Sequence, residues 1–169
     1  RMKSLEVLLE KSNNKYSKEE KIALAEDKNN RYVTMLMEMG EKDLLPGVKE
    51  TLLALRDKGY KLAIGSSSKN TGYILKKIGL EGFFDAVSDG NNIMKSKPDP
   101  EVFIKAAEYL QLPPKECYVV EDAKAGIDAA KAGGFIAIAI GAAINYEQAD
   151  YKLNKFEDLK ELVSNRSER

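Results

Sequence analysis

Short apolar segments alternate with helix-like segments of about ten residues from Pro46 to the end of this chain of 169 residues. The apolar segments cover 60–65, 84–87, 117–120 and 135–140, and helices are expected at 46–58, 70–78, 100–110, 124–132 and 156–163. Strands separated by helices join in parallel through right-handed crossovers. The alternation therefore predicts a three-layer α/β fold with a parallel sheet.

The first 42 residues follow a different pattern, because their apolar residues recur at helical spacing only. Ser17 and Glu20 are spaced as in a capping box, which begins a helix, and Gly40 is typical of a helix end. We therefore expect two domains, an α-helical one at 1–42 and an α/β one at 43–169.

Composition excludes several classes of function. The absence of histidine excludes Ser-His-Asp and Cys-His catalysis and histidine-bound zinc. The 27 basic and 27 acidic residues cancel, which argues against a nucleic-acid partner. No apolar run reaches the about 18 residues of a membrane span, and the single cysteine, Cys117, fits a reducing cytoplasm. We expect a cytoplasmic protein without nucleic-acid or membrane partners.

A run of hydroxyl, ammonium and amide side chains follows the first apolar segment of the α/β region. It consists of Ser66, Ser67, Ser68, Lys69 and Asn70. Hydroxyls and backbone N–H groups at the start of a helix can bind an anion, so this run could hold a phosphate. An ordinary helix cap is the alternative, since Ser and Asn are common there.

Lys97 stands in a segment that two prolines, Pro98 and Pro100, hold extended at the entry to a helix. A lysine fixed in this way can present a positive charge to a phosphate. The alternative is a solvated surface lysine.

Glu121 and Asp122 follow an apolar strand, where carboxylates could bind a hard cation. Magnesium needs only one or two protein carboxylates beside phosphate and water oxygens. The alternative is a helix start that carries acids for its dipole. All three loops follow strand ends, which a parallel sheet brings to one edge. Together they predict a phosphoryl-transfer site.

On these residues the sequence resembles the haloacid dehalogenase-like phosphotransferase superfamily, whose core is a Rossmann-like parallel sheet and whose cap is α-helical. Ser66, Lys97 and the pair Glu121-Asp122 match its second, third and fourth motifs in order and spacing. The likeness is greatest to the branch that interconverts glucose phosphates. Related sugar-phosphate phosphatases share much of the same pattern.

The superfamily's first motif, Asp-x-Asp on the first strand of the core, is missing from this sequence. Asp99 and Asp150 do not follow an apolar strand in that way. The resemblance therefore implies that the first strand and its nucleophile lie upstream of Arg1. It also implies that the strands beside it have unpaired edges and that the chain alone is inactive.

The resemblance implies a role for each candidate residue. Lys97 and Ser66 are the expected catalytic residues, and Glu121 and Asp122 the expected ligands of Mg²⁺. The expected phosphate-binding and substrate-binding residues are Arg1, Lys28, Ser66, Ser67, Ser68, Lys69, Asn70 and Lys97. The expected partner is a sugar phosphate, and the intact enzyme is expected to be a monomer.

Overall fold

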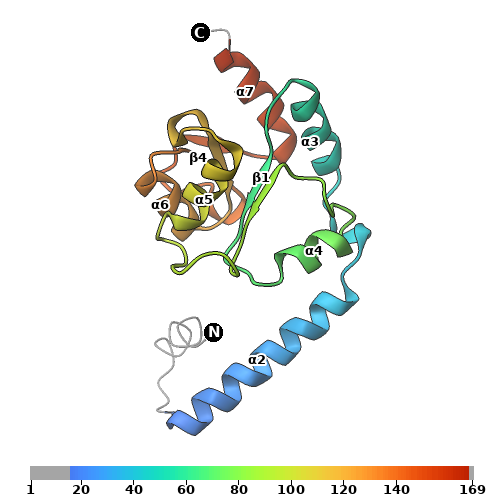
Figure 1. Ribbon diagram of the computed structural model, residues 1–169, viewed down its shortest axis with the longest axis vertical. Helices are drawn as coiled ribbons and strands as arrows, with labels where there is room; N and C mark the ends of the chain where they lie inside the picture. The colour runs from blue at the N-terminus through green and yellow to red at the C-terminus, as the bar shows by residue number, and fades with distance from the viewer. Residues whose placement is uncertain (1–15, 168–169) are drawn as a thin grey trace. The chain divides into compact units, whose positions relative to one another are not determined.

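The computed structural model describes residues 16–167, and the chain divides into two compact units, 1–40 and 41–169. Within the described residues the first unit is one helix, α2 (Lys18–Glu38), drawn in blue in Figure 1. Across the part of the chain that the structure describes, no helix has the length and apolar character that crossing a membrane requires.

The predicted capping box at the start of α2 is confirmed. The backbone N–H of Glu20 donates to Ser17 Oγ at 3.1 Å, and the N–H of Ser17 donates to the Glu20 carboxylate at 2.7 Å. The helix ends at Glu38, earlier than Gly40 predicts, because Met39 already has an extended backbone. The capping box thus stabilises the start of the helix locally. The helix ends because the backbone of Met39 is extended, and methionine is not a residue type that predicts a helix end.

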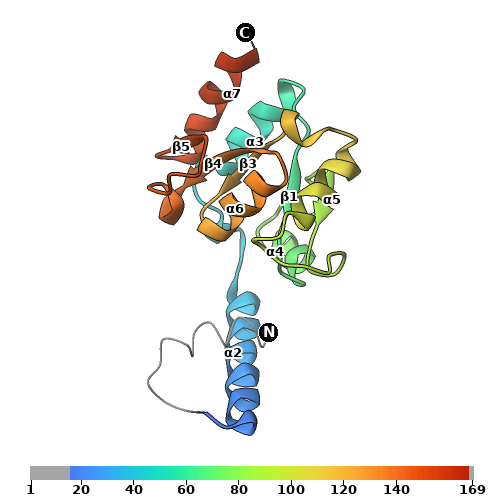
Figure 2. The same cartoon turned by 90° about the vertical axis from the view of Figure 1, so that its left-hand side faces the viewer.

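The second unit alternates strands with helices, which confirms the α/β class (Figures 1 and 2). Its helices are α3 (Val48–Asp57), α4 (Thr71–Lys77), α5 (Glu101–Leu110), α6 (Lys124–Ala132) and α7 (Leu159–Ser167). Its strands are β1 (Ala63–Gly65), β2 (Ala86–Ser88), β3 (Tyr118–Glu121), β4 (Ile136–Ile140) and β5 (Tyr151–Leu153). Short 3₁₀ turns are η1 (Glu41–Asp43), η2 (Pro114–Glu116), η3 (Gly141–Ala143) and η4 (Phe156–Asp158).

The strands form two parallel sheets. One pairs β1 with β2, in register Ile64 to Val87, and the other has the order β3-β4-β5, with Val120 opposite Ile138. Figure 2 shows β1 beside α4 and α5, apart from the sheet of β3, β4 and β5. The outer edge of β1 and the outer edge of β3 are therefore paired with no strand of the described chain.

Helices cover both faces of these sheets, which gives the three layers. Along β4 the side chains alternate: Ala137 and Ala139 belong to the apolar cluster that contains α5 and α6, and Ile138 to the one that contains α3 and α7. The small alanines let α6 lie close to the sheet, and Ile138 fills the space on the opposite face, where it is fully buried. A continuous core on each face holds the strand ends in place.

Two strand predictions were wrong in detail. β1 begins at Ala63 and not at residue 60, because the Asp85 carboxylate takes the N–H of Leu62 at 2.8 Å and ends the ladder there. The strand β5 was missed, since its three residues carry little apolar signal. The last helix also begins later than expected, at Leu159, after a 3₁₀ turn.

Asp85 makes the stability of this unit depend on pH. The N–H of Leu62, then Lys61 at 3.7 Å and Arg56 at 3.9 Å, hold the pKa of the Asp85 carboxyl below its ordinary value of 3.8. Because folding lowers the pKa of Asp85, its ionised carboxylate stabilises the fold above pH 3.8. This contribution is lost as the pH falls through the pKa that Asp85 has in the folded state.

We therefore expect Asp85→Asn to lower the free energy of unfolding by about 1 kcal/mol near pH 7, because a charged hydrogen-bond acceptor is lost at a partly exposed position. Urea unfolding at about pH 7 and about pH 2.5 measures the difference, which should shrink at the lower pH. Asp57→Asn, at the exposed end of α3, is the control. A difference that stays constant between the two pH values would contradict this account.

Candidate active site

The serine loop, residues 66–70, connects β1 to α4 and is folded by its own hydroxyls. Ser66 Oγ accepts the N–H of Ser68 at 3.2 Å, and Ser68 Oγ accepts the N–H of Asn70 at 3.1 Å. The hydroxyl of Thr71 donates to the carbonyl of Ser68 at 2.8 Å. The Ser66 oxygen accepts within the loop, so its proton remains to donate to a ligand oxygen.

The side chains of the serine loop alternate in exposure. Ser67 and Lys69 are exposed, whereas Ser66, Ser68 and Asn70 are half-buried. The loop is thus more than the predicted alternative of a single helix cap, because two hydroxyls order the backbone in succession. Asn70 itself is the N-cap residue of α4 and makes no side-chain cap hydrogen bond.

The segment 88–92, which begins at the last residue of β2 and forms the loop after it, supports the serine loop. The N–H of Gly90 donates to the Ser68 carbonyl at 3.1 Å, and Asn91 Nδ2 donates to the Lys69 carbonyl at 2.9 Å. Gly90 has no side chain, and a Cβ there would lie 2.6 Å from the Ser67 carbonyl oxygen. The two loops can approach this closely only because residue 90 is glycine.

This second loop was absent from the candidate residues predicted from sequence. Its signal was a run of turn-forming residues, Asp89 to Asn92, directly after an apolar strand. The Asn92 side chain orders the run, since its Oδ1 accepts from the Ser88 hydroxyl at 3.2 Å and the Asp89 N–H at 3.0 Å. Contacts with the serine loop, more than 15 residues away in sequence, give it a role that local pattern does not reveal.

Lys97 points inward, with 18% of its side chain exposed, which contradicts the alternative of a solvated lysine. Its Nζ donates to the carbonyl of Gly65 at 3.1 Å and to the Glu121 carboxylate, and lies 4.5 Å from the centre of the Phe103 ring. The ammonium thereby connects the end of β1 to the end of β3. A positive charge is held where two strands end.

The segment before Lys97 is fixed by Glu101 in the first turn of α5. Its carboxylate accepts the N–H groups of Met94, at 3.0 Å, and Lys95, at 2.7 Å. These two hydrogen bonds lower the pKa of the Glu101 carboxyl, and the one from Met94 has the larger effect. A carboxylate that stays ionised at neutral pH therefore anchors the approach to Lys97.

Glu121, the last residue of β3, is buried with 8% of its surface exposed. It lies against Gly126 in α6, where a Cβ would overlap the carboxylate. Its contact with Lys97 is a partly buried ion pair, and removal of Lys97 would leave the buried carboxylate without this partner. Asp122 is the next residue and is exposed.

Of the two carboxylates predicted to bind magnesium, Asp122 fits an ion that takes few ligands from the protein. Residues 16–167 contain no group of three or more Asp, Glu, Cys or His side chains able to hold a metal. Asp122 is exposed at the strand end and could supply one oxygen, whereas Glu121 is engaged by Lys97. Mg²⁺ is commonly bound by one or two carboxylates with substrate phosphate and water.

The structure thus brings together Lys97 and Glu121, two of the predicted site residues. They lie beside Gly65, which directly precedes a third, Ser66. Lys28 lies on α2 in the first unit and is exposed. Arg1 is outside the described residues.

Residues 2–140 match the sequence model of the family described as Haloacid dehalogenase-like hydrolase, and the chain belongs to this family. It is 35% identical over 145 residues to β-phosphoglucomutase of Bacillus subtilis (strain 168), covering 86% of this chain and 64% of that protein. It is 36% identical over 91 residues to a phosphorylated carbohydrates phosphatase of Thermotoga maritima, covering 53% of this chain and 42% of that protein. The chain therefore spans less than two thirds of either relative.

The fold is similar to that of solved members of the family. The crystal structure of β-phosphoglucomutase from Clostridium difficile matches with a TM-score of 0.82 and 35% identity, over 100% of this chain and 79% of that one. A haloacid dehalogenase phosphatase from Thermococcus onnurineus matches with a TM-score of 0.65 and 32% identity, over 70% of this chain and 57% of that one.

Proposed function

We propose that this protein transfers a phosphoryl group on a sugar phosphate, and that it interconverts β-glucose 1-phosphate and glucose 6-phosphate through the 1,6-bisphosphate. The observation that carries the proposal is the partly buried ammonium of Lys97, held between the ends of β1 and β3 next to the serine loop. The two relatives named β-phosphoglucomutase support the choice of substrate.

In this reaction Lys97 would neutralise charge on the transferring phosphoryl group. The Ser66 hydroxyl, whose oxygen already accepts the Ser68 N–H, would donate its proton to a phosphoryl oxygen. The part of the site that faces the sugar phosphate would be lined by Ser67, Ser68, Lys69 and Asn70. Bound Mg²⁺, held by Asp122 with Glu121 beside it, would supply further neutralisation of the phosphate.

The proposed nucleophile is a carboxylate of the family's Asp-x-Asp motif, which this sequence lacks. Its oxygen would bond to phosphorus as the bond from phosphorus to the sugar oxygen breaks, giving an aspartyl phosphate. The sugar oxygen would take a proton from the second Asp of the same motif. In the reverse step that carboxylate would accept the proton of another sugar hydroxyl, whose oxygen bonds to phosphorus as the bond from phosphorus to the aspartyl oxygen breaks. We propose that residues 1–42 belong to a helical cap, in which Arg1 and Lys28 bind the second phosphate, and that residues 43–169 belong to the catalytic core.

A sugar-phosphate phosphatase is the second candidate function. The phosphatase of Thermotoga maritima supports it, as does the fructose-1-phosphate phosphatase YqaB of Escherichia coli, 33% identical over 116 residues. A third possibility is that the chain alone is inactive.

The decisive assay uses the longest protein that the gene encodes, with β-glucose 1-phosphate, Mg²⁺ and a trace of glucose 1,6-bisphosphate. A mutase forms glucose 6-phosphate faster than it releases inorganic phosphate. If inorganic phosphate is released faster than glucose 6-phosphate forms, the protein is a phosphatase and the mutase proposal is wrong. No turnover in the 169-residue chain, beside activity in the longer form, would show that the chain alone is inactive.

The role of Asp122 is tested by its own variant in the same assay. We expect Asp122→Ala to raise the Mg²⁺ concentration for half-maximal rate by at least about 10-fold, because one oxygen ligand is lost. Asp57→Ala, at an exposed position on α3, is the control and should leave the titration unchanged. A normal Mg²⁺ titration for Asp122→Ala would remove Asp122 from the metal site.

A further inference from the structure

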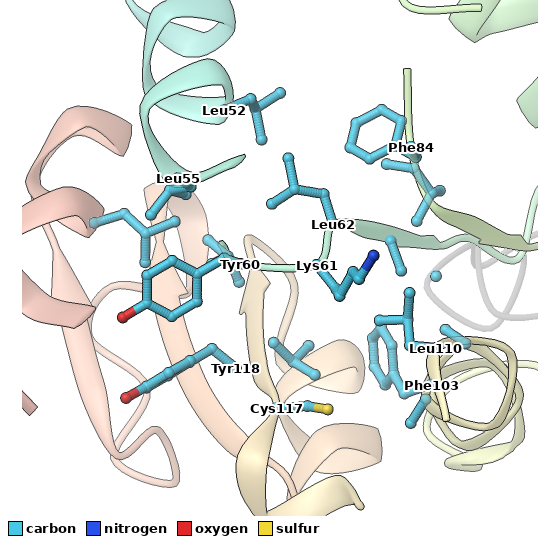
Figure 3. A pocket seen from close by; sticks show the side chains of 18 of the residues that line it. Leu52, Leu55, Tyr60, Lys61, Leu62, Phe84, Phe103, Leu110, Cys117 and Tyr118 are labelled. Atoms are coloured by element: carbon cyan, nitrogen blue, oxygen red, sulfur yellow. The ribbon is translucent and has the colours of Figure 1, made fainter. Parts of the chain in front are cut away.

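The helix α5 has two faces that contact different parts of the second unit. Phe103 and Leu110 lie on one face and point into a cavity of about 470 Å³ between the two sheets (Figure 3). Glu101 and Lys105 lie one helical turn apart on the opposite face, where the Lys105 ammonium is 3.3 Å from the Glu101 carboxylate. Phe103 is buried, so packing on the first face fixes the position of the ion pair on the second.

Lys105 contacts the segment 88–92, which supports the serine loop. Its ammonium donates to the backbone carbonyl of Asn92. The Asn92 side chain in turn accepts from the Ser88 hydroxyl at 3.2 Å and from the Asp89 N–H at 3.0 Å. Because both the main chain and the side chain of Asn92 are bonded, Lys105 attaches this segment to α5.

Glu101 contacts the other segment, the one that leads to Lys97. Its carboxylate accepts the N–H of Lys95 at 2.7 Å and, through Oε1, the N–H of Met94 at 3.0 Å. The Lys105 ammonium pairs with the same Oε1 atom. The ion pair of Glu101 and Lys105 therefore joins the segment that supports the serine loop to the segment that carries Lys97.

This ion pair is more enclosed than the other pair in the same region. Lys105 has 32% of its side chain exposed, whereas Lys95, which pairs with Asp99, has 71% exposed. An exposed ion pair contributes little, because water and salt screen it and its side chains lose entropy. The Lys105 ammonium also bonds a backbone carbonyl, so its direction is fixed as well as its distance.

We propose that Lys105 is a positioning residue, which acts through Asn92 and Glu101 to hold the serine loop and Lys97 in one relative position. The inference rests on the proposed function, in which both must contact the same phosphoryl group. A small displacement of either one would cost transition-state stabilisation, because the reaction requires both at once.

The first test measures amide hydrogen exchange in the longest protein that the gene encodes. The reporter is the N–H of Gly90, which donates to the Ser68 carbonyl of the serine loop. We expect this N–H to exchange at least ~10-fold faster in Lys105→Met, because the segment 88–92 is released from α5. The N–H of Ile127, bonded within α6, should exchange at its normal rate.

Two further variants serve as controls. Lys105→Arg should keep exchange at Gly90 within ~3-fold of normal, because a guanidinium can donate to the Asn92 carbonyl and pair with Glu101. Lys115→Met makes the same change at an exposed lysine in η2 and should leave exchange at Gly90 unaltered.

The second test asks whether Glu101 and Gly90 communicate through Lys105. Glu101→Gln should speed exchange at Gly90 by at least ~3-fold, although the Glu101 carboxylate bonds the other segment. In the Lys105→Met background the same change should have no further effect on Gly90. It should still speed exchange at Lys95, whose N–H donates directly to Glu101.

The third test is kinetic and uses β-glucose 1-phosphate with Mg²⁺. We expect Lys105→Met to lower kcat at least ~10-fold and to change KM by less than ~3-fold, since the transition state needs both groups aligned and substrate binding does not. Lys105→Arg should restore kcat to within ~3-fold of normal, and Lys115→Met should leave it unchanged.

Four results would overturn the proposal. They are normal exchange at Gly90 in Lys105→Met, equal acceleration at Gly90 and Ile127, an arginine variant as impaired as the methionine variant, and faster exchange at Gly90 with a normal kcat. Equal acceleration would make Lys105 a contributor to overall stability only. If the unaltered protein transfers no phosphoryl group, the proposed function fails, and the exchange results still decide whether Lys105 joins the two segments.

Discussion

Replacing Lys97 by methionine is expected to lower kcat at least ~100-fold, because the ammonium would stabilise charge that develops in the transition state. Methionine keeps the apolar stem beside Phe103 and removes the charge that bonds Gly65 and Glu121. The measurement is the initial rate at saturating substrate and Mg²⁺, in the longest protein that the gene encodes.

The matched control for this variant is Lys95→Met. Lys95 is two positions away in the same loop, but 71% of its side chain is exposed and it pairs with Asp99. Its variant should keep kcat within about 2-fold, because surface ion pairs contribute little. A Lys97→Met enzyme that unfolds at the normal temperature and turns over at the normal rate would remove Lys97 from the catalytic machinery.

Replacing Gly90 by alanine is expected to weaken binding of inorganic phosphate at least ~10-fold, through displacement of the serine loop. The added Cβ would lie 2.6 Å from the Ser67 carbonyl oxygen and 2.9 Å from the Lys69 nitrogen. These neighbours are backbone atoms, which cannot move aside as a flexible side chain can. The hydrogen bond from Gly90 to Ser68 would be broken, and with it the support for the loop.

Calorimetric titration with phosphate measures the effect, and thermal unfolding shows whether the fold persists. Gly72→Ala is the control, since its added Cβ would have no atom within 4 Å apart from its chain neighbours and the backbone of its own helix, and alanine favours the helix α4 in which it stands. It should bind phosphate normally and unfold at a slightly higher temperature. Normal phosphate affinity in Gly90→Ala would show that the second loop does not position the first.

Much of the architecture can be predicted from local sequence. The capping box of Ser17 and Glu20 and the helix 124–132 are observed at the predicted residues. The positions of the three polar loops after strand ends are observed as well. These features depend on residues only a few positions apart, so side-chain spacing and backbone propensity are sufficient to specify them.

Contacts between distant segments were decided by tertiary packing. Lys97 could equally have been a solvated lysine until α5 and β3 placed Phe103 and Glu121 around it. Gly90 and Asp85 likewise act on backbone groups more than 20 residues away in sequence. Such pairings depend on the core that brings the segments together, and the short β5 forms only because β4 offers it an edge. Local propensity does not specify contacts between segments that are distant in sequence. The partners of the residues at the strand ends could therefore be identified only in the folded structure.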